Sequence, residues 1–242
     1  MSYQQDHLSR YYDRYWQEGV AGWRVRASVS EPIAGLLRSM SANRSVLDYG
    51  GGDGRRYGQI LREGAASYTV VDISPAVLAQ RRAMGDEAIS FDELRSRDRV
   101  FEVLLILEVL QHVLDPEDIL SQLAEHMAPA GKALISVPNA FSAFNRLRML
   151  GGRLPASGVG AKGVRNQTYV APHIRFFDAT SLKTLVSRAG LALDALFTDQ
   201  LDLWHATPYQ TPRLRACTQK NSAWFRLSAS TLYASCSKLC GS

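Results

Sequence analysis

Short apolar runs alternate with segments of helical periodicity along the chain. The apolar runs predict strands at residues 45–48, 67–72, 87–91, 101–107, 133–137 and 191–197, with a last strand within 230–238. The segments between them predict helices at residues 31–40, 55–62, 115–127 and 180–189, one that starts at residue 74, and one near 142–150. Such alternation favours a parallel sheet with crossover helices. The strand at 101–107 is the most apolar, so we expect it to be central and buried on both faces.

Capping residues and helix breakers mark several of these boundaries. Ser74 precedes Pro75, an order typical of a helix N-cap followed by the first helical position. Gly190 follows the last predicted helix and suits the position just beyond a helix C-terminus. Residues 129–131, Pro-Ala-Gly, are expected to end the preceding helix in a turn.

A glycine-rich turn follows the first predicted strand. Residues 46–54 read Val-Leu-Asp-Tyr-Gly-Gly-Gly-Asp-Gly, so the strand ends in Asp48 and glycines alternate at Gly50, Gly52 and Gly54. Alternate glycines allow positive φ and leave no Cβ on the inner side of the turn. A ligand can then lie directly against the backbone at the carboxyl edge of a parallel sheet. The alternative is an ordinary surface turn.

A second predicted strand also ends in an acid, Asp72, about 20 residues after Gly52. This spacing is typical of a first βαβ unit whose second strand ends in a carboxylate that binds ribose hydroxyls. A carboxylate can accept from two hydroxyls at once. Nicotinamide enzymes share the layout, but Asp48 would repel a pyrophosphate and would tolerate a ligand with a cationic group. A helix-capping role is the alternative for Asp72.

Composition narrows the class of protein. The chain has 242 residues, of which 46% are hydrophobic, enough for one large α/β domain. No apolar run approaches the roughly 18 residues of a membrane span, and the first residues lack the layout of a signal peptide. The three cysteines, Cys217, Cys236 and Cys240, contain no Cys-x-x-Cys pair, which argues against a disulfide framework or a zinc site. We therefore expect a reduced, cytoplasmic protein.

The net charge of +5 is too small and too dispersed to indicate a nucleic-acid partner. Residues 141–172 are basic without a single acid, and include Arg146, Arg148, Arg153 and Arg165. Guanidinium groups pair with carboxylate or phosphate in a two-pronged fashion, so Arg146 and Arg153 are candidates for binding an anionic small molecule. A solvated loop or a partner surface is the alternative. The acid-free segment 203–242 is interpreted as solvated surface.

Taken together, these segments resemble the class I S-adenosylmethionine-dependent methyltransferases. Residues 46–54 look like motif I of that family, with Asp-x-Gly-x-Gly-x-Gly intact, and residues 71–74 resemble its ribose-binding strand end. Residues 108–116 and 129–139 resemble the segments around the family's fourth and fifth strands. Residues 173–177, His-Ile-Arg-Phe-Phe, are typical of one subgroup.

The resemblance spans roughly residues 10–200 and implies one domain over residues 1–242. Its fold would be α/β and Rossmann-like: a seven-stranded sheet, mostly parallel with an antiparallel last strand, and helices on both faces. We also expect an N-terminal helical cap at about residues 1–40 and a lid-like insertion at about 140–172. A connection as long as the latter is more often a lid or binding loop than an idle link.

The resemblance also implies where S-adenosylmethionine would bind. Gly50 and Gly52 would pass under the methionyl and ribose parts, Asp72 would bind the ribose hydroxyls, and Asp92 would meet the adenine amino group. Leu107 and Glu108 would lie near the sulfonium. The full predicted cofactor set is Asp48, Gly50, Gly52, Gly54, Asp72, Ile73, Asp92, Leu107 and Glu108.

Methyl transfer needs few protein groups, because the sulfonium is already a strong electrophile. The protein must align nucleophile, methyl and sulfur, and a hydroxyl or amine acceptor can also need a base. His112 follows the fourth strand at the carboxyl edge, so we predict it as that base. His173 begins the segment that returns from the predicted lid, and is predicted to be a base or an orienting donor. Packing or helix capping is the alternative for His112.

Two further details concern metal and substrate. Some quinone-biosynthesis relatives carry Glu-x-x-Glu-His after the fourth strand and are thought to bind a divalent cation, whereas this chain has Glu108-x-x-Gln111-His112. Losing a carboxylate weakens a site for a hard cation, so we predict no metal.

Among the aromatic residues near the N-terminus, Tyr15 is a candidate substrate contact; hydrophobic packing of a first helix explains the cluster equally well.

Three functions compete. The leading hypothesis is methyl transfer from S-adenosylmethionine to a small-molecule acceptor in biosynthesis or natural-product tailoring. We expect the methylated atom to be an oxygen rather than a nitrogen or a carbon. The second is a non-catalytic or regulatory partner of the MetW type, because residues 139–155 resemble that group. The third is a nicotinamide oxidoreductase, although no Tyr-x-x-x-Lys pair would supply its acid. We expect a small-molecule acceptor, no nucleic acid, no membrane span, and either a homodimer or a partner enzyme.

Overall fold

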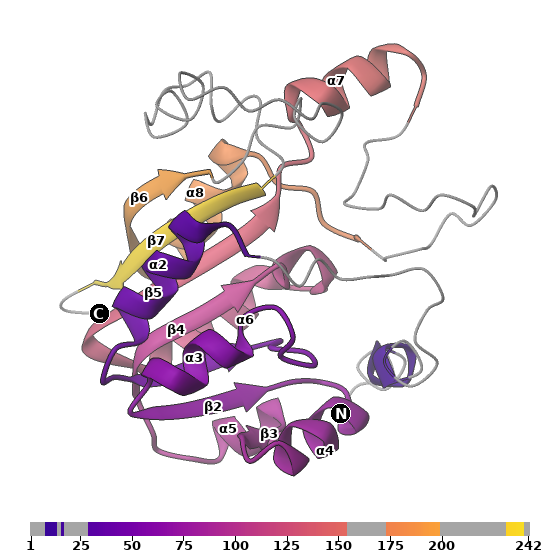
Figure 1. The fold of residues 1–242 in the computed structure, drawn as a ribbon. Coiled ribbons are helices and arrows are strands. Elements are labelled where there is room, and N and C mark those ends of the chain that lie inside the picture. Colours follow the sequence, from indigo (N-terminus) through magenta and orange to yellow (C-terminus); the bar gives the residue numbers. More distant parts are fainter. Residues whose placement is uncertain (1–7, 14–15, 17–28, 154–172, 199–230, 240–242) are drawn as a thin grey trace. The chain divides into compact units, whose positions relative to one another are not determined.

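A computed structural model describes residues 8–13, 16, 29–153, 173–198 and 231–239 (Figure 1). The described residues belong to two compact units. The first unit lies within residues 1–107 and 125–132, and the second within residues 108–124 and 133–242. No helix in these described stretches is long and apolar enough to cross a membrane.

The strands form one seven-stranded sheet in the order β3-β2-β1-β4-β5-β7-β6. β1 pairs in parallel with β2 and β4, and β2 pairs in parallel with β3, whereas β6 and β7 are antiparallel. The predicted Rossmann-like sheet with an antiparallel last strand is therefore confirmed. The strands are β1 Ser45–Tyr49, β2 Ser67–Val71, β3 Glu87–Ile89, β4 Phe101–Leu107, β5 Met127–Pro138, β6 Leu191–Phe197 and β7 Thr231–Lys238.

The centre of the first unit is built on β1 and β4. Every residue of β4 except Glu102 is buried, as predicted for a strand covered on both faces. Leu47 of β1 lies opposite Leu104 of β4, and both are at most 1% exposed. This packing fixes the carboxyl end of β1, from which the glycine turn leaves.

Helices flank the strands, and most begin where the sequence predicts. Ser74 caps α4, since its Oγ accepts the Val77 N–H at 3.3 Å, and Gly190 follows α8 with φ of 75°. The helices are α2 Glu31–Ser41, α3 Gly58–Gly64, α4 Pro75–Ala83, α5 Phe91–Arg95, α6 Pro116–Glu125, α7 Ala143–Leu150 and α8 Ala179–Arg188, with the 3-10 turn η1 Leu110–His112.

Three predicted boundaries are wrong. Helix α3 starts at Gly58 rather than residue 55, because the Asp53 carboxylate accepts the Arg55 N–H at 3.0 Å and holds a turn there. The strand predicted at 87–91 stops at Ile89, because Ser90 begins α5 with a capping box. Residues 129–131 lie within β5 rather than in a turn.

Candidate active site

The glycine turn adopts the backbone conformation that its sequence predicts. Gly50, Gly52 and Gly54 have φ of 71°, 51° and 73°, a region that side chains rarely adopt. The Gly50 N–H donates to the Val71 carbonyl at 2.7 Å, which ties the turn to the end of β2. The turn and the β2 end are therefore one structure, within a single unit of the protein.

Asp72 holds both parts of this structure. Its Oδ2 accepts the Gly52 N–H at 3.1 Å and its Oδ1 accepts the Ser74 N–H at 3.0 Å. Burial raises the pKa of the Asp72 carboxyl from 3.8 to about 6, against the effect of these hydrogen bonds. Each carboxylate oxygen keeps a second acceptor site, so Asp72 fits a pair of ribose hydroxyls. The carboxylate thus shapes the glycine turn as well as being a candidate ligand.

A buried polar network lies beneath the glycine turn. Tyr68 donates its hydroxyl to Asp48 Oδ2 at 2.6 Å, and Arg81 Nη2 donates to the same hydroxyl at 2.6 Å. Burial raises the pKa of the Asp48 carboxyl, while the Tyr68 hydrogen bond and the Arg81 charge lower it. Asp86 completes the network with Arg81 and with Arg62, at 3.2 and 2.8 Å. Asp48 therefore lies 3% exposed within the core, as a support for the turn.

Arg81, like Tyr68, was not predicted from the sequence as a residue of this region. Its side chain is fully buried, and its Nη1 lies 1.6 Å from the position that a Cβ on Gly54 would occupy. An added Cβ on Gly58 would be 2.7 Å from the same nitrogen. These two glycines therefore leave room for a guanidinium. An arginine on an amphipathic helix is ordinarily predicted to lie at the surface, and the residues around Arg81 in the sequence do not indicate that it is buried.

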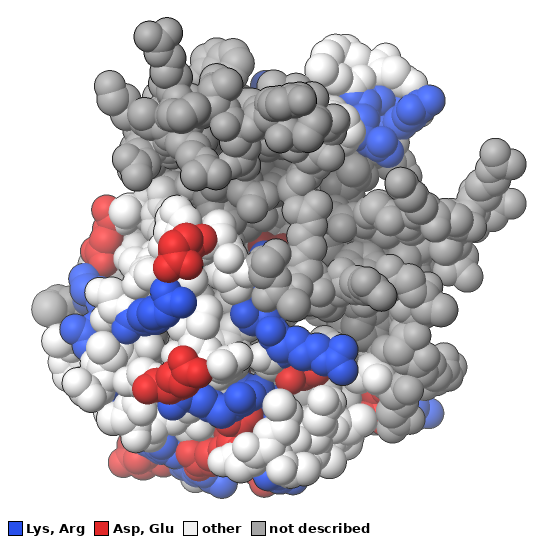
Figure 2. All heavy atoms as spheres, viewed as in Figure 1, with Lys and Arg blue, Asp and Glu red and all other residues white. Residues whose placement is uncertain are grey.

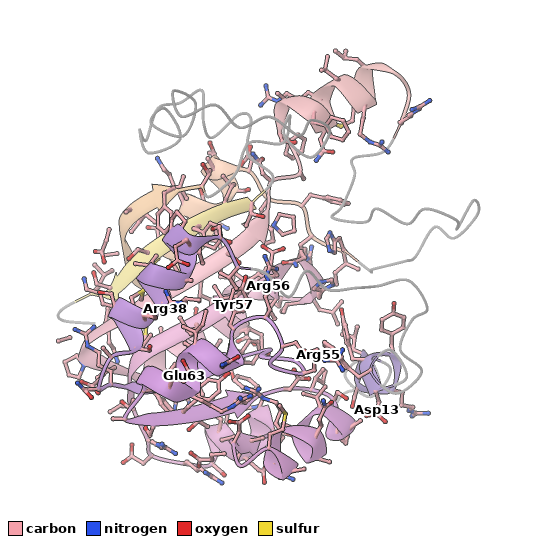
Figure 3. The ribbon with its side chains drawn as sticks, viewed as in Figure 1. Asp13, Arg38, Arg55, Arg56, Tyr57 and Glu63 are labelled. Atoms are coloured by element: carbon pink, nitrogen blue, oxygen red, sulfur yellow. The ribbon has the colours of Figure 1, made fainter. Side chains whose placement is uncertain are left out.

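The helical residues 8–13 contact the same region (Figure 3). Asp13 Oδ1 accepts the Ala76 N–H at 2.9 Å and the Ser74 hydroxyl at 3.0 Å, and Ser9 donates to the carbonyl of Ile73 at 3.0 Å. The indole of Trp16 lies 2.9 Å from where a Cβ on Gly52 would be. An N-terminal segment thus packs on the glycine turn, whereas Tyr15 lies outside the described residues.

The remaining predicted cofactor residues of this unit differ in exposure. Ile73 is 44% exposed, and Leu107 is buried at the end of β4. Asp92 lies on α5 with a side chain 58% exposed and a weak contact of 3.9 Å to Arg95. The structure therefore places Asp92 at the surface, near the α5 N-terminus, rather than inside the core.

Glu108, directly after β4, has a strained backbone. Its φ of 60° is uncommon for a residue with a side chain. Several hydrogen bonds hold it: the Glu108 N–H donates to Ser136 Oγ and to the Ser136 carbonyl, each at 3.0 Å, and Gln111 Nε2 donates to the Glu108 carbonyl at 2.7 Å. Such strain is concentrated at functional sites, which supports Glu108 as a site residue.

The structure brings the two predicted histidines together in the second unit. The rings of His112 and His173 meet edge to face, with centroids 4.7 Å apart. The N–H groups of Ile174 and Arg175 donate to the Gln111 carbonyl at 2.9 and 3.1 Å, which holds the two segments side by side. Burial, with a smaller contribution from His112, lowers the pKa of His173 to about 4. His173 is therefore a neutral imidazole at neutral pH.

The predicted substrate arginines lie on and after α7. Arg146 is exposed on the helix, and its Nε donates to the Phe141 carbonyl at 2.8 Å. Arg153 is exposed beyond the helix C-terminus. Most of the predicted lid, residues 154–172, lies outside the described residues. Within the described part of the chain, no group of three or more His, Cys, Asp or Glu residues could hold a metal ion.

Comparison with protein families identifies the class. The methyltransferase-domain family matches residues 20–196, more than half of the chain, so the protein belongs to that family. The sequence prediction of an S-adenosylmethionine-dependent methyltransferase is thereby confirmed at the level of the family. A search of curated proteins finds no significant match.

Solved structures share the fold at low sequence identity. A methyltransferase from Archaeoglobus fulgidus, described as SAM-dependent, is 16% identical with a TM-score of 0.58, over 86% of this chain and 94% of its own. A possible histamine N-methyltransferase from Thermotoga maritima is 13% identical with a TM-score of 0.61, over 97% and 100%. Magnesium protoporphyrin IX methyltransferase from Synechocystis, with bound SAH, is 13% identical with a TM-score of 0.55, over 94% and 97%.

Proposed function

We propose that the protein transfers the methyl group of S-adenosylmethionine to an oxygen of a small-molecule acceptor, with His112 as the general base. The observation that carries the proposal is the contact between His112, which follows β4, and His173, which precedes α8. Two of the structural neighbours are named for acceptors unlike each other, histamine for the possible N-methyltransferase and magnesium protoporphyrin IX for the other. The fold therefore does not dictate the acceptor, and this chain's own residues must select it.

The residues would divide the work as follows. The cofactor supplies an electrophilic methyl group, so the protein needs mainly to position it and exclude water. Asp72 and the glycine turn would hold the ribose, and Leu107 and Glu108 would border the reacting centre. His112 would take the proton of the acceptor hydroxyl.

His173 would orient its neighbour rather than act as the base. A group with a pKa near 4 is a weak base at neutral pH. Its neutral ring, held edge to face against His112, can fix the direction of that imidazole. Of the two roles that the sequence predicts for His173, a base or an orienting donor, this proposal keeps the orienting one.

The basic residues support a finer proposal about the acceptor. Arg146 and Arg153 are exposed on a segment without acids, and guanidinium groups bind carboxylate or phosphate well. We infer that the acceptor carries such a group. Arg153→Ala would then raise KM for the acceptor and leave the affinity for S-adenosylhomocysteine unchanged. An unchanged KM would remove the anionic group from the proposal.

The deciding experiment uses methyl-labelled S-adenosylmethionine. The protein is incubated with a metabolite extract, and labelled products are separated and identified. Label on an oxygen of a small molecule is the expected outcome; label on nitrogen or carbon would contradict the O-directed proposal. Since His112→Ala and wild-type protein are run side by side, loss of the labelled product in the variant tests the base directly.

A MetW-type partner protein is the second candidate, supported by the resemblance of residues 139–155. It predicts S-adenosylmethionine binding without methyl transfer to any extract component, together with stable co-purification of a second enzyme. Homodimer formation and a reducing cytoplasmic setting are companion proposals.

A further inference from the structure

Helix α7 presents its apolar side outward. Asn145 is the one buried residue of this eight-residue helix. Phe144, Leu147 and Leu150 are 43%, 64% and 85% exposed. A surface helix ordinarily packs its apolar side against the core and leaves its polar side in water. In α7 this arrangement is reversed.

Polar contacts explain the reversed orientation. Ser142 caps α7 by accepting the Asn145 N–H at 3.3 Å. Asn145 Nδ2 donates to the carbonyl of Asn139, just after β5, at 3.2 Å. These bonds fix the polar side of the helix to its own unit. The outward direction of the apolar side is therefore part of the folded arrangement.

Arginines border the apolar side on both edges. Ala143, Leu147 and Leu150 share one side of the helix by their spacing of four and three residues, and Phe144 adjoins them. Arg146 and Arg148 occupy the two edges of that side. The Arg148 guanidinium lies 5.8 Å from the centroid of the Phe144 ring. In Figure 2 the part of the surface over α7 shows blue and white atoms without red.

Exposed apolar side chains also occur outside α7 in the second unit. The Ala140 N–H donates to the Phe177 carbonyl at 3.0 Å, so the segment 174–177 meets the chain before α7 at Phe177. Within this segment Ile174 and Phe176 are 41% and 53% exposed, and Phe141 before the helix is 40% exposed. The second unit therefore exposes apolar side chains on this segment as well as on α7, and Phe141 directly precedes the helix.

We propose that α7 and the preceding Phe141, the α7 surface, dock the protein on a membrane that contains anionic lipids. Exposed leucine and phenylalanine side chains enter the boundary between headgroups and acyl chains. Arginines at the edges reach outward to lipid phosphates while their stems cover apolar surface. Charge complementarity selects this partner, since residues 141–172 carry no acid to repel an anionic surface. The proposal does not depend on methyl transfer.

Vesicle sedimentation tests this proposal on the full chain without cofactor or acceptor. One set of vesicles contains phosphatidylcholine alone, and a second also contains phosphatidylglycerol. We expect binding to the second set only, with weaker binding at high salt. The variant Leu147→Glu/Leu150→Glu should lower the affinity at least about tenfold, and Arg148→Glu should lower it similarly. Met84→Glu, an equivalent change at a 48% exposed site on the first unit, is the control and should bind as wild type.

Several outcomes would overturn the proposal. The proposal is wrong if the Leu147→Glu/Leu150→Glu variant binds anionic vesicles as tightly as the wild type. It is also wrong if the wild type does not bind anionic vesicles. Competition by free glycerol phosphate would point to a phosphate site instead of a bilayer. A lipid-independent dimer that the same double substitution dissociates would assign the surface to a second copy. Thermal unfolding and S-adenosylhomocysteine binding confirm that each variant is folded.

Discussion

At the scale of single residues, Asp72 links cofactor binding to pH. Its pKa of about 6 means that the carboxylate is lost as the pH falls through 6. We predict that the affinity for S-adenosylhomocysteine declines by up to about tenfold for each pH unit below that value. Asp72→Asn should bind weakly and show a flat profile. Calorimetric titration over this range measures both, and a pH-independent wild-type affinity would contradict the assignment.

Protonation of Asp72, which is expected to weaken cofactor binding, is expected to stabilise the fold of the unliganded protein. The native Asp72 carboxyl binds its proton more tightly than the unfolded one, since burial raises its pKa above the ordinary 3.8. This group therefore favours the fold increasingly as the pH falls from about 6 towards 4. His173 acts the other way over that window, because its native pKa is lowered from 6.5 to about 4. Its contribution is complete above pH 6.5 and is lost as the pH falls towards 4.

His112 is predicted to affect turnover rather than cofactor binding. Removing a general base typically costs about 10² to 10⁴ in rate, so His112→Ala should lower kcat by that factor and leave the S-adenosylhomocysteine affinity within twofold. His126→Ala is a matched histidine control, since the His126 ring faces the Arg99 carbonyl in the first unit. Equal kcat in both variants would rule out His112 as the base.

At the scale of elements, the glycine turn and α4 fit together through one side chain. Gly54→Ala would place a Cβ against the buried Arg81 guanidinium in addition to straining a φ of 73°. Gly85→Ala strains a φ of 87° with nothing within 4 Å, so it isolates the backbone cost. We expect about 1–2 kcal/mol of destabilisation for Gly85→Ala and about 1–3 kcal/mol more for Gly54→Ala. Denaturant unfolding compares them; equal losses would show that Arg81 moves aside freely.

The N-terminal helical residues are predicted to stabilise the start of α4. Asp13 accepts from Ala76 and Ser74, so it acts as a second cap beside the Ser74 side chain. Asp13→Ala should cost about 1 kcal/mol in the free energy of unfolding and speed hydrogen exchange at the Ala76 amide. Asp13→Asn, which keeps an acceptor oxygen, should lose less. Unchanged exchange at Ala76 would show that this contact is not made in solution.

At the scale of the whole molecule, cofactor binding should stabilise the fold measurably. A ligand at about 100 times its Kd adds about 2.7 kcal/mol, which for a chain of this size raises Tm by about 5–10 °C. S-adenosylhomocysteine should produce this shift and NADH should not. Hydrogen exchange should slow at residues 49–54 and 72–76 of the first unit. A shift with NADH alone would contradict the cofactor assignment.

Much of the sheet could be predicted because each strand carries its own local signal. An apolar run followed by an acid or a glycine marked β1, β2 and β4, and Ser74-Pro75 marked the start of α4. α5 was missed although Ser90 and Glu93 have the spacing of a capping box. β5 was underestimated because Pro129 and Gly131 signal a turn, whereas here they lie inside a strand.

The site was only partly predictable for a different reason. Asp72 and the glycines follow from a motif, because neighbours in sequence create their geometry. Other residues of the site act through contacts between segments that are distant in sequence: Arg81, Tyr68 and Asp13. Local periodicity carries no information about such contacts. The paired histidines lie between these cases: each was a candidate alone, and only the fold brings their rings to 4.7 Å.

The buried guanidinium also constrains how this sequence can change over generations. Any side chain at position 54 or 58 occupies space that Arg81 Nη1 already fills, so neither glycine can be replaced first without loss. A lineage that shortens residue 81 would free both glycines, but would leave the Tyr68–Asp48 pair without its cation and Asp86 with Arg62 alone. These positions should therefore be inherited as a set, with 54, 58, 68, 81 and 86 changing together or not at all.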